Sequence, residues 1–369
     1  MTTVEETAEL GRTLRRFLEQ RSSETAVRAL MEDPRGYDPV VWQQLAGQLG
    51  LLGLTIPEEY GGLGYGISEI FPVFEEMGRS LLPSPYLSTV GLAVPALLAS
   101  GDPDVLAAYL PGIAAGTTIA TVAICEGEGG WVEEGLTARA THDETGWRVT
   151  GEKTYATDAQ SCDLILVLAR TEQGPVLMAV EVGADGLAVE PQPVLDLTRR
   201  LATVRLADTP ARLVGAVGDG WSIVHQALRV ATVALAAEQV GGAQRVLEMG
   251  VEYANTRVAF GRKIGSFQAV KHKLADVLVL VENSRSAALD AVRAASGSDP
   301  DADLAVSVAK AYCSDAYLKA AAENVQVHGG IGFTWEHPAH LYFKRAKSSE
   351  LLFGDPTYHR ELLAQRIGI

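Results

Sequence analysis

Apolar and polar positions along the chain follow a period that changes twice. Up to about residue 116 the apolar positions recur at helical spacing, with helix-start signals such as Asp102-Pro103. Residues 117–215 show a period of two and many β-branched side chains, for example in DLILVLAR and PVLMAVEV, which predicts strands. From residue 216 to 369 long helical patterns return. The chain is therefore expected to be an α+β protein with an N-terminal helical domain (1–116), a central β domain (117–215) and a C-terminal helical domain (216–369).

Two long apolar stripes indicate that the C-terminal stretch is a helical bundle. Within residues 221–256 apolar side chains stand three or four positions apart with one gap, and a similar stripe occupies residues 266–282. Helices with such regular stripes bury them against neighbouring helices. A third helical pattern, residues 303–327, leads into the segment QVHGGIGFT, which holds three glycines within four positions.

The glycine segment and the turn between the two striped helices have the residue types of a phosphate-binding site. Gly329 and Gly330 follow a helix and let backbone N–H groups approach a large ligand closely, although a helix C-cap needs the same residues. Arg257 ends the first striped helix and Gln268 starts the second, so a guanidinium and an amide are available to a diphosphate. An arginine that neutralises a helix C-terminus is the alternative interpretation.

Composition and charge narrow the classes of function. With 47% hydrophobic and 21% charged residues the chain is globular, and its formal net charge of −15 argues against a nucleic-acid partner. The three cysteines, Cys125, Cys162 and Cys313, are too widely spaced for a disulfide framework or a CxxC metal site. No run reaches the roughly 18 apolar residues of a membrane span, and the first residues do not resemble a secretion signal. A soluble, cytoplasmic protein without a metal is expected.

Three dispersed segments together resemble one known family. LLGLTIPEEYGGLG, YANTRVAFGRKIGSFQAVKHKLAD and QVHGGIGFTWEHP are similar to segments of acyl-CoA dehydrogenases and follow one another in the same order. The resemblance extends over the whole chain. It implies the fold of that family, with a helical N-terminal domain, a central β-barrel or sandwich and a C-terminal four-helix bundle. It also implies an FAD cofactor bound between the subunits of a tetramer.

The resemblance assigns flavin-binding roles to particular residues. Arg257 resembles the arginine that binds the FAD diphosphate. Phe260 and Gln268 resemble its neighbours in that site. Gln326, Gly329 and Gly330 resemble the loop that receives the adenosine diphosphate. In the β region, positions that contact the flavin ring in relatives hold Cys125, Tyr155 and Thr157. Cys125 lacks the hydroxyl that relatives have there, and Tyr155 replaces a tryptophan, so packing within a strand is an equal alternative for Tyr155.

The catalytic base is absent from its usual positions. The family's reaction removes a proton from the carbon α to the thioester and transfers a hydride from the β-carbon to the flavin, which requires a carboxylate base. Where relatives often carry this glutamate the chain has Phe353, whose backbone N–H can still donate to the thioester oxygen. The other known position of the base matches Ala231. Asp355 and Glu238 are the nearby candidate bases, and helix capping by Asp355 and a structural role for Glu238 are the competing interpretations.

Retained ADP-binding residues and a missing base together suggest one of two unlike subunits, with the base on the partner. The expected activity is FAD-dependent α,β-dehydrogenation of an acyl-CoA thioester by a homo- or heterotetramer. Bacterial relatives of the mixed type act on bulky acyl-CoA thioesters, including steroid side chains, and an electron-transfer flavoprotein is the expected electron acceptor. Two alternatives stay open: a non-catalytic scaffold or CoA-binding subunit, and a flavin-dependent monooxygenase-like member of the same fold.

Overall fold

The chain folds into two compact units, which are described separately. The computed structural model describes residues 4–127, 130–297 and 299–369. The first unit contains residues 4–28, 67–82 and 232–369, and the second contains residues 29–66 and 83–231. Among the helices of the described residues, none is long and apolar enough to cross a bilayer.

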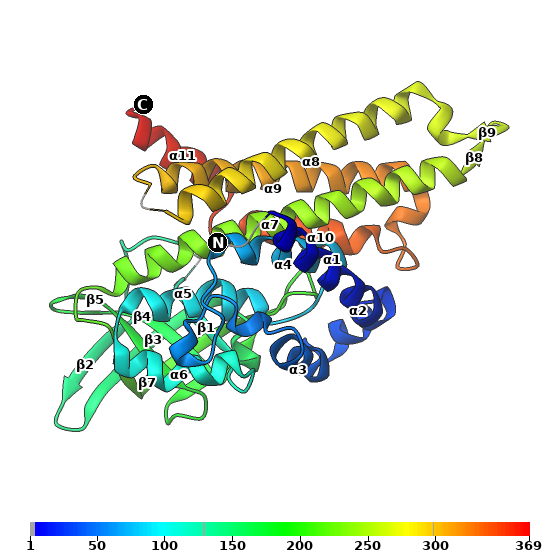
Figure 1. The fold of residues 1–369 in the computed structure, drawn as a ribbon. Coiled ribbons are helices and arrows are strands. Elements are labelled where there is room, and N and C mark those ends of the chain that lie inside the picture. Colours follow the sequence, from blue (N-terminus) through cyan, green and yellow to red (C-terminus); the bar gives the residue numbers. More distant parts are fainter. Residues whose placement is uncertain (1–3, 128–129, 298) are drawn as a thin grey trace. The chain divides into compact units, whose positions relative to one another are not determined.

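The first unit is helical and is drawn mostly in dark blue and from yellow-green to red in Figure 1. Its elements are α1 (Val4–Arg21), the start of α2 (Glu24–Glu32), α4 (Ile67–Ser80), most of α7 (Gly220–Thr256), the hairpin β8 (Val258–Ala259) and β9 (Arg262–Lys263), η5 (Ile264–Ser266), α8 (Gln268–Ala295), α9 (Ala302–His328), η6 (Gly329–Phe333), α10 (Ala339–Leu351) and α11 (Pro356–Ile367). Helix α9 packs against α8, α10 and α11, which makes it the centre of this unit.

Small residues let three of these helices approach one another closely. A methyl group on Gly78 of α4 would lie 2.0 Å from the carbonyl oxygen of Glu238 on α7, so only glycine fits there. On the same helix α7, Gly242 faces the ring of Tyr317 from α9, and a methyl group would lie 2.4 Å from that ring. The apolar stripe of α7 is therefore buried against both α4 and α9.

The second unit is built around a β-sheet that closes on itself. Its helical elements are α3 (Pro39–Gly47), α5 (Val94–Ser100), α6 (Pro103–Ala114), the π-helix η3 (Leu87–Ala93) and the short 3-10 helices η1 (Leu51–Gly53), η2 (Glu58–Tyr60) and η4 (Ala159–Ser161). Its strands are β1 (Ala120–Ala123), β2 (Arg139–Asp143), β3 (Gly146–Thr157), β4 (Leu164–Thr171), β5 (Gly174–Glu181), β6 (Leu187–Pro191) and β7 (Leu201–Val214). The hydrogen-bonded order β4-β2-β3-β7-β5 returns to β4, which forms a barrel, while β1 pairs with β4 and β6 with β7.

Strand β4 shows why this sheet has a core. Residues 164–169 are all buried, so the strand reads as a continuous apolar run rather than an alternating one. The changes of period predicted near residues 116 and 215 correspond to the ends of α6 at Ala114 and of β7 at Val214. The expected helical N- and C-terminal parts and the central β region are confirmed. The compact units follow a different division, because most of the N-terminal helical stretch, residues 29–66 and 83–116, belongs to the unit with the β-sheet, and α7 contributes to both units.

Candidate functional site

The turn after α7 presents the predicted diphosphate arginine to solvent. The backbone of Arg257 is fixed at both sides, because its N–H donates to the Tyr253 carbonyl (2.8 Å) and its carbonyl accepts from the Ile264 N–H (2.9 Å). Its side chain is exposed. Phe260 turns the β8–β9 hairpin with a left-handed φ of +52° and is 96% exposed. Gln268, also exposed, is the first residue of α8.

The glycine segment lies beside this turn, at the same end of the first unit. The ring of His328, the last residue of α9, stacks on Tyr253 of α7 with centroids 4.3 Å apart. Lys273 of α8 forms an ion pair with Glu323 of α9 at 2.5 Å. These two contacts connect the start of α8 and the end of α7 to the residues around Gly329. We call this region, which contains Arg257, Phe260, Gln268, Gln326, Gly329 and Gly330, the hairpin end.

The residues of the hairpin end fit the diphosphate side of a flavin nucleotide. Gly329 has a φ of +63°, and neither Gly329 nor Gly330 has an atom within 4 Å of the position of a Cβ, so open space adjoins this backbone. Phe333 and Trp335 of the following loop are 79% and 61% exposed. Large aromatic side chains are usually buried, and exposed ones close together indicate an interaction surface. An exposed guanidinium, an open glycine backbone and uncovered aromatic rings are groups that bind a nucleotide, while the Gly329 N–H itself donates to the Gln326 and Val325 carbonyls as the C-cap of α9.

The turn that replaces the usual base is buried and firmly held. Phe353 is 3% exposed and has a left-handed φ of +60°, which is uncommon for a residue with a bulky side chain. Its carbonyl is 3.0 Å from Nε2 of His359, which donates to it. The fully buried Lys310 of α9 donates to the carbonyls of Ser349 (3.1 Å) and Glu350 (2.9 Å) in the last turn of α10. Lys310 and His359 thus fix the backbone on both sides of the Phe353 N–H.

The two candidate carboxylates are both engaged in contacts within the first unit. Asp355 is the N-cap residue of α11, and its Oδ1 accepts from the Tyr358 N–H at 2.7 Å. Glu238 is 5% exposed and accepts from Nη1 of Arg345 at 2.9 Å. Ala231 is fully buried. The cap and the buried ion pair are the arrangements expected of structural carboxylates, and a role as base stays a prediction for both Asp355 and Glu238.

The hairpin end and the Phe353 turn lie far apart along α9. Lys310, which holds the turn, and Gln326 at the hairpin end are separated by roughly 24 Å of helix at 1.5 Å per residue. Both belong to the first unit. The structure therefore brings the six predicted ADP-binding residues together but leaves the position of the usual base at the other end of α9.

The predicted flavin-ring residues all lie in the second unit. Cys125 is buried, and burial raises the pKa of its thiol to about 12. Tyr155 has a φ of +54° and is 39% exposed at an irregularity in the pairing of β3 with β7, while Thr157 is buried 3.4 Å from the hydroxyl of Thr121. The exposed tyrosine at a strained position is available for a ligand contact. The Thr157 hydroxyl faces that of Thr121.

The sequence alone did not identify two buried lysines, Lys153 and Lys310, and one buried histidine, His359, as residues that hold the backbone near the predicted site residues. Lys153 is fully buried and donates to Glu126 (2.6 Å) and to the Ile124 carbonyl (3.1 Å). Burial lowers the pKa of Lys153, and the Glu126 carboxylate opposes that shift. Lys310 and His359 likewise bond to backbone carbonyls beside Phe353. A lysine inside an apolar helical or strand pattern was the available signal, because such a position forces the ammonium to find internal acceptors.

Comparison with known proteins agrees with this geometry. Residues 4–117 match the model of the acyl-CoA dehydrogenase N-terminal domain, and residues 218–368 match that of the acyl-CoA dehydrogenase C-terminal domain. Acyl-CoA dehydrogenase IpdE2 of Mycobacterium tuberculosis is 35% identical over 98% of this chain and 96% of its own length. Among solved structures, the ChsE4-ChsE5 complex of Mycobacterium tuberculosis has a TM-score of 0.90 and 30% identity, covering 99% of this chain and 98% of the other. The Tcur3481-Tcur3483 steroid ACAD has a TM-score of 0.88 and 32% identity, with 98% of both chains covered.

The family, the reaction and the cofactor predicted from the three sequence segments are confirmed by these matches. Among the described residues no group of His, Cys, Asp and Glu is arranged to hold a metal ion. The chain belongs to the acyl-CoA dehydrogenase family, whose members catalyse FAD-dependent dehydrogenation of acyl-CoA thioesters.

Proposed function

We propose that this chain is one subunit of a heterotetrameric acyl-CoA dehydrogenase, in which its hairpin end completes the FAD site of a partner subunit that carries the catalytic base. The single observation that carries the proposal is the Phe353 turn. At the place of the usual glutamate a buried phenyl ring stands in a fixed backbone conformation, and a phenyl ring cannot accept a proton. The residues expected to bind the ADP part are retained together.

The separation of the two regions also favours a shared site. The hairpin end lies roughly 24 Å along α9 from Lys310 and the Phe353 turn, so a subunit that lacks its own base can still donate a complete nucleotide-binding surface. Exposure of Phe260 at 96% agrees with a surface that a neighbouring subunit and its flavin cover. We further propose that α7, α8, α9 and α10 form the four-helix bundle of the family fold.

Each group at the hairpin end has a defined task in this proposal. When bound, FAD accepts the hydride that leaves the β-carbon of the thioester. The Arg257 guanidinium binds the diphosphate oxygens and the Gln268 amide completes their hydrogen bonding. The backbone of Gly329 and Gly330, with no Cβ in the way, lets the ADP part approach closely. Phe260 covers the nucleotide from solvent. These groups bind and orient, and they take no proton.

The Phe353 turn retains one possible catalytic contact. Its backbone N–H is a donor for the thioester oxygen, where negative charge develops when the α-proton leaves. Lys310 and His359 act as positioning residues, because they hold the carbonyls on either side of this N–H. Since the side chain of Phe353 is buried, it also keeps water from that position.

The substrate and the electron acceptor are parts of the same proposal. A relative that is described as a steroid ACAD supports a bulky acyl-CoA thioester, such as one with a steroid side chain, as the substrate class. An electron-transfer flavoprotein is the proposed electron acceptor, and the cytoplasm the proposed compartment. The engaged state of Asp355 and Glu238 favours this division of labour over a homomer with its own base.

The test compares the chain alone with the chain co-expressed with a second acyl-CoA dehydrogenase subunit. Alone, it is expected to purify without turnover, whereas the mixed complex retains FAD and is bleached by acyl-CoA under anaerobic conditions. Arg257→Ala in the complex should weaken FAD binding about 10- to 100-fold, because charge-assisted hydrogen bonds to phosphate are lost. Arg293→Ala, which removes an exposed arginine of α8, is the matched control and should leave FAD content unchanged.

Two results would contradict the proposal. A yellow homotetramer of this chain alone that an acyl-CoA bleaches would show that the chain has its own base. Unchanged FAD content in the Arg257→Ala complex would reduce Arg257 to a helix-terminus arginine and support the scaffold alternative. Steady production of peroxide or a hydroxylated product in place of electron transfer would instead identify the monooxygenase-like alternative.

A further inference from the structure

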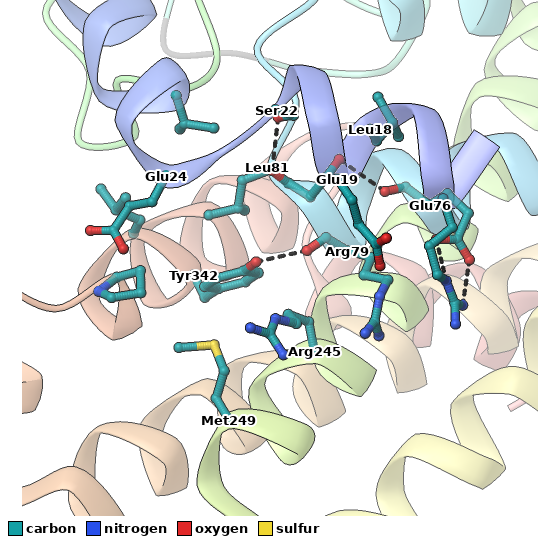
Figure 2. A pocket seen from close by; sticks show the side chains of 15 residues that line it. Leu18, Glu19, Ser22, Glu24, Glu76, Arg79, Leu81, Arg245, Met249 and Tyr342 are labelled. Carbon is teal, nitrogen blue, oxygen red and sulfur yellow. Dashed lines mark hydrogen bonds and ion pairs between the residues drawn. The ribbon is translucent and has the colours of Figure 1, made fainter. Parts of the chain in front are cut away.

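A cavity of about 310 Å³ lies within the first unit, among side chains of α1, α2, α4, α7 and α10. Its volume is at the lower end of the range for small-molecule sites. Figure 2 shows Arg245 and Met249 of α7 on one side of it, Tyr342 of α10 beside them, and Leu81 and residues of α1 opposite. We call it the α1–α10 cavity. None of the residues predicted to bind FAD or to act as base lines it.

The arginines that line this cavity differ in how their charge is compensated. Arg15 forms two hydrogen bonds with Glu76, at 2.9 and 2.6 Å, and this pair is neutral. Arg79 forms two with Glu248, at 2.8 and 2.5 Å. Arg245 lies 3.6 Å from the same Glu248 carboxylate, so two guanidiniums share one negative charge. The α7 side of the cavity therefore carries excess positive charge.

Part of the remaining lining is apolar and firmly held, and it lies beside polar and charged side chains of α1, α2 and α4. The Tyr342 hydroxyl donates to the Arg79 carbonyl at 2.7 Å, which fixes the ring as one wall. Burial raises the pKa of Tyr342 to about 12, so the phenol stays neutral. Leu18 and Leu341 are almost fully buried. Leu81 holds its side chain against the cavity with a left-handed φ of +50°, and such strained non-glycine residues concentrate at ligand-binding positions.

We propose that the α1–α10 cavity binds a small organic carboxylate with an apolar body. The carboxylate pairs with Arg245, whose planar guanidinium matches it, and the apolar body packs on Leu18, Leu81 and Met249. Glu19 and Glu24 also line the cavity and oppose a ligand of higher negative charge, so a monocarboxylate is favoured over a phosphate. The inference goes beyond the proposed function and does not depend on it, because it involves neither FAD nor the partner subunit.

Calorimetry with octanoate as the probe tests this site without turnover. Octanoate is expected to bind the wild-type protein, while octanol and inorganic phosphate bind far more weakly, because one lacks the charge and the other the apolar body. Arg245→Gln should weaken octanoate binding about 10-fold through loss of a charge-assisted hydrogen bond. Glu19→Gln should strengthen it a few-fold, since a like charge leaves the cavity. Arg12→Gln, at an exposed position of α1 outside the cavity, is the matched control.

The relative affinities of the three proteins and of the probes show whether the α1–α10 cavity binds the carboxylate. Octanoate affinity that is the same in wild type, Arg245→Gln and Glu19→Gln overturns the proposal, because the ligand then binds elsewhere, for example in an acyl-CoA pocket. Phosphate that binds as tightly as octanoate overturns the apolar part of it. Because Glu19 is exposed, its variant is expected to fold even if Arg245→Gln does not, and the opposite signs of the two effects cannot arise from a general loss of structure.

Discussion

Glu238→Gln distinguishes a structural carboxylate from a catalytic base. Glu238 and Arg345 are both 5% exposed and their side chains are 2.9 Å apart, so the substitution leaves a buried guanidinium without its counter-charge. Breaking a buried ion pair from one side typically costs about 3–5 kcal/mol. Glutamine keeps one oxygen that can accept from the guanidinium, so we expect the lower end, about 3 kcal/mol. The substitution is expected to lower the stability of the first unit, with no further loss of turnover in enzyme that remains folded.

Hydrogen exchange of peptides from α7 and α10 measures this effect locally, which is suitable because the chain has two compact units. Arg345→Met alone should destabilise to a similar degree, since it leaves the carboxylate buried. The double variant Glu238→Gln/Arg345→Met should recover part of the loss, with a coupling energy of about 1–3 kcal/mol. If Glu238→Gln exchanges like the wild type within about 0.5 kcal/mol while turnover of the assembled enzyme is lost, the structural interpretation is wrong.

Two further predictions concern packing and pH. Gly78→Ala should destabilise the first unit by more than about 3 kcal/mol, because its methyl group would lie 2.0 Å from the Glu238 carbonyl oxygen. Gly47→Ala is the control and should be neutral or slightly stabilising, since no atom lies within 4 Å of the added methyl group. Thermal unfolding compares the two variants, and equal melting temperatures would contradict the close helix contact. Burial and the nearby Lys310 ammonium lower the pKa of His359 from 6.5 to about 4. Between these two pH values the imidazole binds a proton in the unfolded chain but not in the folded chain. The free energy of unfolding therefore falls as the pH drops from about 6.5 to about 4, by up to roughly 3 kcal/mol. Denaturant unfolding across this range should show a smaller loss in His359→Gln and an unchanged one in His142→Gln, at an exposed histidine; identical slopes in all three proteins would refute it.

Local features were predictable from the residues because their causes are local. The change from helical to strand periodicity, the turn between α7 and α8 and the cap at Asp355 each depend on a few adjacent residues. The fate of Glu238 depended instead on Arg345, which lies 107 residues away in the sequence. A helical stripe placed Glu238 among apolar residues but did not identify its partner. The same holds for Lys310, whose acceptors belong to another helix.

By itself, the sequence determined the order of helical and strand segments, the chemistry available in the glycine segment and at Arg257, and the loss of a carboxylate at Phe353. Only the tertiary structure decided that the six residues predicted to bind the ADP part lie together at one end of the first unit. It also decided that Asp355 and Glu238 are engaged and that Arg79 and Arg245 share one carboxylate beside a cavity. The physical reason is that backbone preferences act over a few residues, whereas charge compensation and cavities arise from side chains that packing brings together from distant parts of the chain.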